Sequence, residues 1–277
     1  MPGFTQEIRG VVITFFSTAS AVGKTIISTN MAAELARQGK KVCLVDFDLQ
    51  FGDVSNYLQL LPQRTSFDLQ QAMVMQGSNV RAEEYLTPFE YHNVVFYVLA
   101  APMKLEESYN IDADKGVAMI RQLQNVFDYV LVDTTSMFSK LNLELLDLST
   151  IVSFLGIVDF IPTIKNMKIG TDTLKKLNYD KNKIRLILNR SNAKTRISID
   201  DVENLLGEPF YHILPNDFQA ASRSIQDGVP LVLRSGGSEL GDALRDLVAR
   251  YTNRAYDDVT MDEDEEVSES WLSRIFG

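Results

Sequence analysis

Short apolar runs that alternate with segments of helical period constrain the fold of this chain more than any other feature. Val130-Leu131-Val132 and the segment 184–188 are mainly apolar at successive positions. Successive side chains of a strand point to opposite faces, so such strands are buried on both sides, as the interior strands of a parallel sheet are. The pattern predicts an α/β fold, a three-layer, doubly wound and mainly parallel sheet covered by helices.

The same pattern gives approximate element boundaries. The predicted strands are 11–17, 41–46, 94–99, 129–133, 151–157, 184–188 and 211–214. The predicted helices are 24–38, 66–75, 115–125, 142–148, 163–177, 199–206, 218–227 and 239–251.

Charge is distributed unevenly along the chain. Of 37 acidic and 27 basic residues, eight acidic and one basic lie from Asp257 to Gly277, which leaves 29 acidic and 26 basic residues in the rest. We predict a folded domain at 1–256, an acidic disordered linker at 257–269 that is too polar to fold alone, and a short amphipathic motif at 270–277. Nucleic acid is an unfavoured partner, because neither part is basic enough to neutralise phosphates.

Other sequence features bear on the compartment. No apolar stretch reaches the roughly 18 residues that span a bilayer, and the first residues do not resemble a signal peptide. The single cysteine, Cys43, excludes a disulfide framework and any multi-cysteine metal site supplied by one chain. We expect a cytoplasmic protein, with peripheral attachment to the inner face of the cell membrane as an option.

The segment Gly23-Lys24-Thr25 opens a predicted helix just after a strand and a loop. A triphosphate requires converging backbone N–H groups, and the amino end of a helix supplies them together with favourable partial charge. In this interpretation Lys24 reaches the β- and γ-phosphates and the Thr25 hydroxyl binds Mg²⁺. The alternative is a plain strand–loop–helix connection, since the general phosphate-loop pattern requires a glycine where this chain has Thr18.

Two segments, 15–25 and 41–50, resemble the MinD/ParA group of P-loop ATPases. The group's loop reads K-G-G-x-G-K-T and its second strand ends in an acid-x-Asp pair, which Asp46 and Asp48 match here. The resemblance covers about residues 10–250. It continues through Asp128-Tyr129-Val130-Leu131-Val132-Asp133, Leu188-Asn189-Arg190, Leu214-Pro215-Asn216-Asp217 and Gly228-Val229-Pro230-Leu231.

Within the group, three segments are similar to the CpaE/TadZ branch, whose members help to place pili and related surface machines. They are 99–102, 159–166 and 188–191.

The resemblance implies ATP and Mg²⁺ as cofactors and assigns roles to residues. It implies catalytic roles for Lys24 and Asp48. Asp48 would orient the attacking water, and the alternative is that Asp48 is an ordinary turn residue. It also implies that Thr25, Asp133 and Asp46 bind Mg²⁺. The alternative for Asp133 is that it caps a helix. The implied nucleotide contacts are Ala21, Val22, Gly23, Lys24, Thr25 and Ile26 in the phosphate loop, Asn189 at the adenine edge, and Pro215 and Asn216 in the last nucleotide loop.

Ala19 stands where the family has a lysine that reaches across a homodimer to the partner's phosphates. Its absence predicts slow hydrolysis, dimerisation through other contacts, or a substitute cation. Lys140 is one candidate substitute, and an ordinary surface lysine is the alternative.

The segment 271–276 places Trp271, Leu272, Ile275 and Phe276 on one side of a helix and is similar to the membrane-targeting tip of MinD proteins. Membrane docking, a groove on a protein partner and folding back on the body remain open, because the preceding acids oppose binding to anionic lipid. The leading hypothesis is a slow ATP-dependent dimeric switch that positions a membrane-associated machine and binds its protein components. A nucleotide-binding scaffold without turnover and a DNA-partition protein are the alternatives.

Overall fold

The computed structural model describes residues 9–191 and 197–258. Eight strands form one sheet in the order β3-β4-β2-β5-β1-β6-β7-β8, and every neighbouring pair is parallel except the antiparallel pair β3 and β4. The strands are β1 (Val11–Phe16), β2 (Val42–Phe47), β3 (Thr87–Tyr91), β4 (Val94–Leu99), β5 (Tyr129–Thr134), β6 (Ile151–Gly156), β7 (Ile184–Leu188) and β8 (His212–Ile213).

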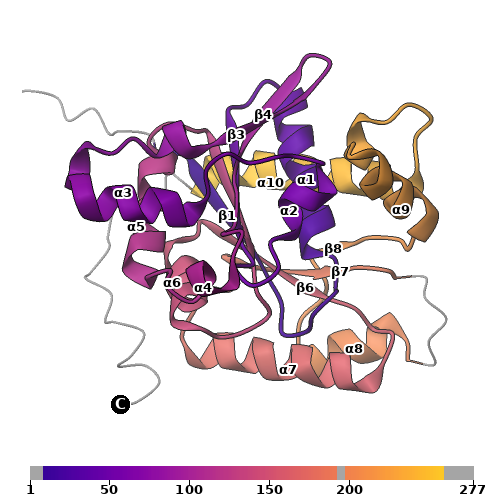
Figure 1. Ribbon diagram of the computed structural model, residues 1–277. Coiled ribbons are helices and arrows are strands. Elements are labelled where there is room, and N and C mark those ends of the chain that lie inside the picture. Colours follow the sequence, from indigo (N-terminus) through magenta and orange to yellow (C-terminus); the bar gives the residue numbers. More distant parts are fainter. Residues whose placement is uncertain (1–8, 192–196, 259–277) are drawn as a thin grey trace, which may run out of the picture.

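Helices cover both faces of this sheet (Figure 1). They are α1 (Lys24–Arg37), α2 (Asp53–Tyr57), α3 (Ser66–Gln76), α4 (Leu105–Ser108), α5 (Ala113–Gln124), α6 (Lys140–Leu148), α7 (Ile161–Lys176), α8 (Ile199–Leu206), α9 (Phe218–Asp227) and α10 (Glu239–Asp258). Short 3₁₀ turns lie at η1 (Gly77–Asn79), η2 (Ala82–Tyr85) and η3 (Leu231–Leu233). The expected three-layer, doubly wound, mainly parallel architecture is confirmed.

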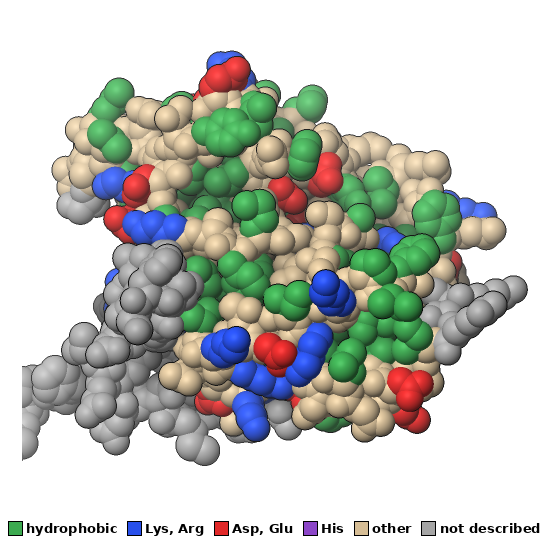
Figure 2. All heavy atoms as spheres, turned by 90° about the horizontal axis from the view of Figure 1, so that it is seen from below, with side chains coloured by type: hydrophobic (Ala, Val, Ile, Leu, Met, Phe, Trp, Pro, Cys, Tyr) green, Lys and Arg blue, Asp and Glu red, His purple; other side chains and the backbone are tan. Residues whose placement is uncertain are grey.

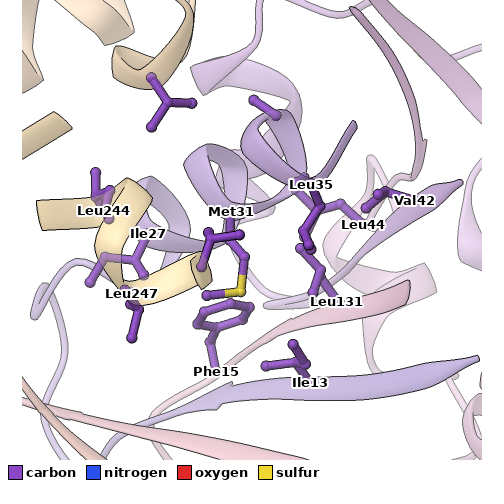
Figure 3. Packing of buried hydrophobic residues seen from close by; sticks show 14 of the residues in the cluster. Ile13, Phe15, Ile27, Met31, Leu35, Val42, Leu44, Leu131, Leu244 and Leu247 are labelled. Carbon is purple, nitrogen blue, oxygen red and sulfur yellow. The ribbon is translucent and has the colours of Figure 1, made fainter. Parts of the chain in front are cut away.

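One face of the sheet packs against α1, which α10 covers in turn (Figure 3). Met31 of α1 lies over Phe15 of β1, and Leu35 lies beside Leu44 of β2 and Leu131 of β5. Ile27 lies beside Leu244 and Leu247 of α10. Each fully buried aliphatic side chain contributes about 1.5–3 kcal/mol, so this cluster holds the last helix of the domain onto the first.

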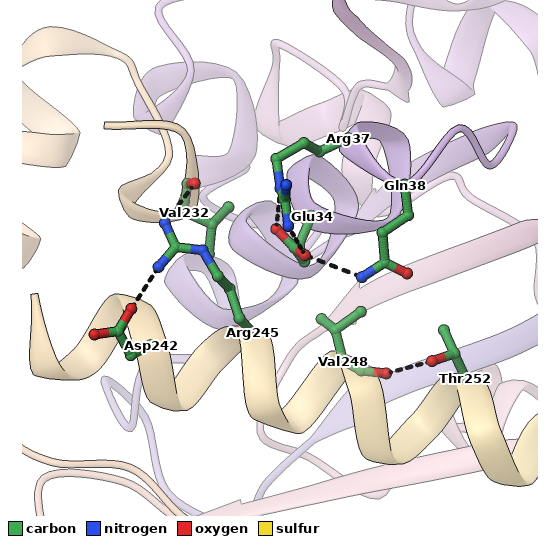
Figure 4. Close-up of polar contacts among 8 residues, drawn as sticks. All are labelled: Glu34, Arg37, Gln38, Val232, Asp242, Arg245, Val248 and Thr252. Carbon is green, nitrogen blue, oxygen red and sulfur yellow. Dashed lines mark hydrogen bonds and ion pairs between the residues drawn. The ribbon is translucent and has the colours of Figure 1, made fainter. Parts of the chain in front are cut away.

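Polar side chains at the edge of this cluster form hydrogen bonds and ion pairs with nearby residues (Figure 4). The buried carboxylate of Glu34 pairs with Arg37 at 2.6 Å and accepts from Gln38 Nε2 at 2.9 Å. Arg245 on α10 donates to the carbonyl of Val232 at 2.8 Å, which joins α10 to η3.

The opposite face carries two further apolar clusters. One lies under α3, α5 and α6 and the other under α6, α7 and α8. On the sheet side, β5 contributes Val130 and Val132 to the first cluster, and β6 contributes Val152 and Phe154 to the second.

The structure differs from the predicted elements at four places. The edge strand β3 and the short helices α2 and α4 were not predicted. Helix α10 runs seven residues past its predicted end at 251, to Asp258. The predicted linker therefore begins inside this helix, and most of the linker and the amphipathic motif with Trp271, Leu272, Ile275 and Phe276 lie outside the described residues.

None of the helices in the described part of the chain combines the length and the apolar character that crossing a bilayer requires.

Candidate functional site

A cavity of about 660 Å³ lies where β1, β2, β5, β7 and β8 end in loops. In a doubly wound sheet this edge is where ligands bind, and the volume suits a small-molecule ligand. Most of the predicted site residues meet here: Ala21, Gly23, Lys24, Thr25, Ile26, Asp48, Asn189, Pro215 and Asn216 all line the cavity.

The amino end of α1 opens onto this cavity. Gly23 is its N-cap with φ of 101°, no side chain caps the helix, and no acidic residue lies in its first turn. The first N–H groups of a helix have no intrahelical partner, so they are available to an anion. Ala21, also in the left-handed region at φ of 57°, turns the preceding loop toward the same point.

Two residues that follow β7 and one carbonyl within α7 hold this loop in place. The Asn189 side-chain amide donates to the carbonyl of Val22 at 2.8 Å, and Arg190 donates to the carbonyl of Ala21 at 3.1 Å. Thr18 donates to the carbonyl of Asn166 in α7 at 2.8 Å. The Val22 side chain is buried, so Val22 contributes its backbone to the loop. Asn189 is hydrogen-bonded to protein groups, and its contact with adenine stays a prediction.

Lys24 is buried and points into a group of hydroxyls. Its ammonium donates to Ser136 Oγ at 3.0 Å, and Ser136 donates to the carbonyl of Ala19 at 2.9 Å. Ser17 contacts Ser136 at 2.9 Å and also donates to Ala19. The lysine is thus held close to the amino end of α1 by weak neutral partners that an anion can replace.

Asp133 fits a bound cation better than a cap. It ends β5, and both of its carboxylate oxygens are buried without a hydrogen-bond partner among the described residues. Burial raises the pKa of Asp133, an effect that the nearby Thr25 hydroxyl and Lys24 ammonium oppose. An orphaned carboxylate beside a threonine hydroxyl matches the donors that Mg²⁺ takes when phosphate oxygens and water complete its shell.

Asp46 has a different environment from the one expected of a metal ligand. It is fully buried behind the cavity wall, and its carboxylate accepts from the backbone N–H groups of Asp48 and Val54, both at 3.1 Å. Burial and the neighbouring Asp133 raise the pKa of Asp46 well above its usual value. Asp46 therefore fixes the loop that carries Asp48 and the start of α2, and its metal role stays a prediction.

Asp48 is partly buried at the cavity wall, one residue beyond β2. Burial raises the pKa of Asp48, and the Lys24 ammonium counteracts this. A carboxylate and an ammonium therefore share one cavity, an arrangement that can hold a water molecule beside a phosphate.

Lys140 does not line the cavity. It is half exposed and pairs with Asp114 at 3.0 Å and Glu144 at 3.5 Å. These contacts fit an ordinary surface lysine.

Several cavity residues were not predicted. Asp53, Tyr57, Ser136 and Arg190 lie in loops or helices that directly follow strand ends, a position that could have marked them. The apolar wall comes from α9 and α10, through Ala221, Ile225, Leu240 and Leu244. Within residues 9–191 and 197–258, no three His, Cys, Asp or Glu side chains cluster as a metal site.

Residues 13–231 match the model of the CobQ/CobB/MinD/ParA nucleotide binding domain. The chain belongs to this family. A MinD/ParA-type domain accounts for the phosphate loop, the strand-end aspartates and the sheet order together, and the predicted membership of the MinD/ParA superfamily is confirmed.

Three individual proteins show how far this MinD/ParA-type domain resembles its relatives. The septum site-determining protein MinD of Helicobacter pylori is 27% identical over 237 residues, covering 80% of this chain and 84% of that protein. A ParA family ATPase from Chlorobium tepidum superposes with a TM-score of 0.78 at 20% identity over 87% of this chain and 99% of that one. MinD from Pyrococcus horikoshii, complexed with Mg-ADP, gives 0.75 at 20% identity over 90% and 98%.

Proposed function

We propose that this MinD/ParA-type domain is an ATP-dependent switch that hydrolyses ATP slowly and pairs with a second copy. The observation that carries the proposal is the uncapped amino end of α1, which faces a cavity lined by Lys24 and Thr25, with the buried carboxylate of Asp133 next to the Thr25 hydroxyl. Amides, ammonium, hydroxyl and carboxylate together suit a polyphosphate bound with a divalent cation.

Each group then has a distinct task. The amides around Gly23 bind phosphate oxygens, and Lys24 exchanges Ser136 for the phosphates. Mg²⁺, held by Thr25 and through water by Asp133, would supply positive charge on the phosphate oxygens. Asp48 holds the attacking water.

The base would lie beside the loops that follow β7 and β8. Asn189, Pro215 and Asn216 face it, and Leu240 and Leu244 add apolar surface. Aromatic bases bind well between apolar walls when a few polar groups fix their edges.

Slow turnover follows from Ala19. A cation that reaches the transferring phosphate is worth about 10³–10⁵ in rate in related phosphoryl-transfer enzymes, and a methyl side chain supplies none. The long residence of ATP suits a switch. If hydrolysis proves absent altogether, the domain is a nucleotide-binding scaffold.

The cellular role proposed for this switch is to position or recruit a membrane-associated machine. The three segments similar to the CpaE/TadZ branch favour a pilus assembly, and the apolar tip with Trp271 and Phe276 favours a location at the inner membrane face. DNA partition is less favoured, because the net charge of −10 opposes binding to the phosphate backbone of DNA.

Calorimetry with ATP and Mg²⁺ tests the proposal, with Lys24→Ala as the site variant and Lys40→Ala, on an exposed turn, as the matched control. Heat of binding should appear in the wild type and the control and vanish in Lys24→Ala. Phosphate release compared with Asp48→Ala separates the switch from the scaffold. No heat at millimolar ATP, or equal heat in all three proteins, would sink the proposal.

A further inference from the structure

The solvent face of α7 has a chemical character that the nucleotide site does not use. Ile161 and Ile169 are 72% and 51% exposed, and Phe160, just before the helix, is 68% exposed. Lys165 and Lys176 are exposed between and beyond them. At 3.6 residues per turn these helical positions form one stripe, opposite the buried side chains that pack onto β6 and β7.

The stripe is also positively charged. Lys168 pairs with Asp172 at 2.7 Å and Lys175 with Glu208 at 2.8 Å. Lys165, Lys176 and Lys181 have no ion-pair partner in the described part of the chain, and Asp180 is the acid beside them.

Figure 2 shows the molecule from the side along which α7 lies in Figure 1. Basic side chains surround one acidic side chain there, with hydrophobic side chains next to them. An apolar stripe flanked by unpaired lysines, on a chain of net charge −10, indicates a partner that is both acidic and apolar.

The chain's own last residues have this composition. Five consecutive acids, Asp262-Glu263-Asp264-Glu265-Glu266, precede the apolar tip with Trp271, Leu272, Ile275 and Phe276. We propose that segment 259–277 docks on the exposed face of α7 of the same molecule. The acids meet the lysines, and the tip covers Phe160, Ile161 and Ile169.

The order of groups along the two segments agrees with this docking. Helix α10 ends at Asp258, and its residue Tyr251 bonds to Ser153 of β6 and packs near Tyr211, just before β8. The tail therefore starts near the amino ends of β6 and β8, and α7 ends at the same edge but on the opposite face of the sheet from α10. Along segment 259–277 the acidic residues come first, where they would reach Lys176 and Lys181. The apolar tip comes after them and would lie toward Ile161.

The length of the segment suffices. Residues 259–271 can extend about 43 Å at roughly 3.3 Å per residue, and α7 with 16 residues is about 24 Å long, so about 19 Å remains for the passage from the face of α10 to the face of α7. Attachment in the same chain gives an effective concentration of the order of millimolar, so a weak contact is populated. Docking withholds the tip from membranes and partner proteins until they compete for it, and it does not depend on the nucleotide proposal.

Paramagnetic broadening of amide NMR signals in the full chain tests the docking. A nitroxide is placed on Ser270→Cys, and Cys43 does not interfere because it is fully buried. At low salt the label should remove most of the signal intensity along the exposed positions of α7, and high salt should restore it. The double variant Lys165→Glu/Lys176→Glu should also restore it, whereas the control Lys40→Glu should not.

Three results would overturn the proposal. They are intact α7 signals at low salt, broadening that survives the double charge reversal, and broadening that appears only when labelled and isotope-enriched molecules are different copies. The last would assign the face to a second copy of the chain. Thermal unfolding of the variants confirms that the surface substitutions leave the fold intact.

Discussion

The side-chain amide of Asn189, at the carboxyl end of β7, donates to the backbone carbonyl of Val22 over 2.8 Å. The Asn189 oxygen accepts the N–H of Arg190 at 2.9 Å, so the amide is held from both sides. One strand end therefore fixes the shape of a loop that lies 167 residues earlier in the sequence.

Asn189→Ala should weaken ATP binding about fivefold, because a net hydrogen bond of this kind is worth roughly 1 kcal/mol and the loop loses its support. Calorimetry of the variant beside Asn182→Ala, an exposed asparagine before β7, measures the effect. An unchanged dissociation constant in both would show that the loop keeps its shape without this contact.

Gly23→Ala should abolish nucleotide binding and destabilise the fold. A Cβ at this position would lie 2.4 Å from Asn189 Nδ2, and φ is 101°. Strained backbone of this kind costs about 1–3 kcal/mol. Gly207→Ala is the matched control, since φ is 78° and a Cβ would meet nothing within 4 Å. Urea unfolding should show the larger loss for Gly23→Ala, and equal losses would contradict the steric argument.

Asp133→Asn should stabilise the ligand-free protein at neutral pH. Burial raises the pKa of Asp133, so the folded state retains a proton that the unfolded chain releases. The contribution of Asp133 to stability is therefore full below the unfolded value of about 3.9 and is lost as the pH rises through the folded value. The difference in unfolding free energy between variant and wild type should grow from about pH 4 toward neutrality.

With Mg²⁺ and ATP present, the wild type should regain the lost stability and Asp133→Asn should not, because only the carboxylate suits the cation. A flat curve for Asp133→Asn would mean that the carboxylate is solvated in solution.

The sequence predicted the centre of the sheet better than its edge. Strands such as β5 are apolar on both faces, and this pattern has few alternatives. In β3 the exposed and buried positions alternate around Phe89, and Pro88 and Glu90 are tolerated because the strand lies at the sheet edge. Helices α2 and α4 have five and four residues, too few for a periodic pattern.

The site was predictable where residues follow strand ends and unpredictable where separate elements meet. Gly23, Lys24 and Asn189 were assigned to one site from local motifs and the family resemblance. Leu240 and Leu244 were not, because an amphipathic helix shows which face is buried without showing what it covers. Asp46 illustrates the same limit: it adjoins the site, yet its carboxylate faces backbone amides.

Ala19→Lys should increase ATP turnover by about tenfold or more, since it restores the cation that related P-loop ATPases present to the phosphates. Phosphate release measured at several protein concentrations would detect the dimer dependence that a contribution in trans requires. Ser20→Lys, at the adjacent exposed position, is the control. Equal rates in both variants would show that Ala19 does not limit hydrolysis.

Tyr251→Phe should cost about 1–3 kcal/mol of stability. The buried Tyr251 hydroxyl contacts Ser153 Oγ at 2.9 Å, and its removal leaves a buried serine hydroxyl without that partner. A double-mutant cycle with Ser153→Ala, measured by urea unfolding, should return a coupling energy of the same order. Strictly additive losses would show that the two hydroxyls act independently.

Because α10 both covers α1 and lines the cavity, the pocket of this protein is completed late during synthesis on the ribosome. The phosphate loop is translated within the first 25 residues, yet Leu240 and Leu244 complete the pocket only near the end of the domain. A nascent chain therefore emerges with the amino end of α1 exposed and its pocket open on one side. The pocket should become complete only after the final helix has been synthesised.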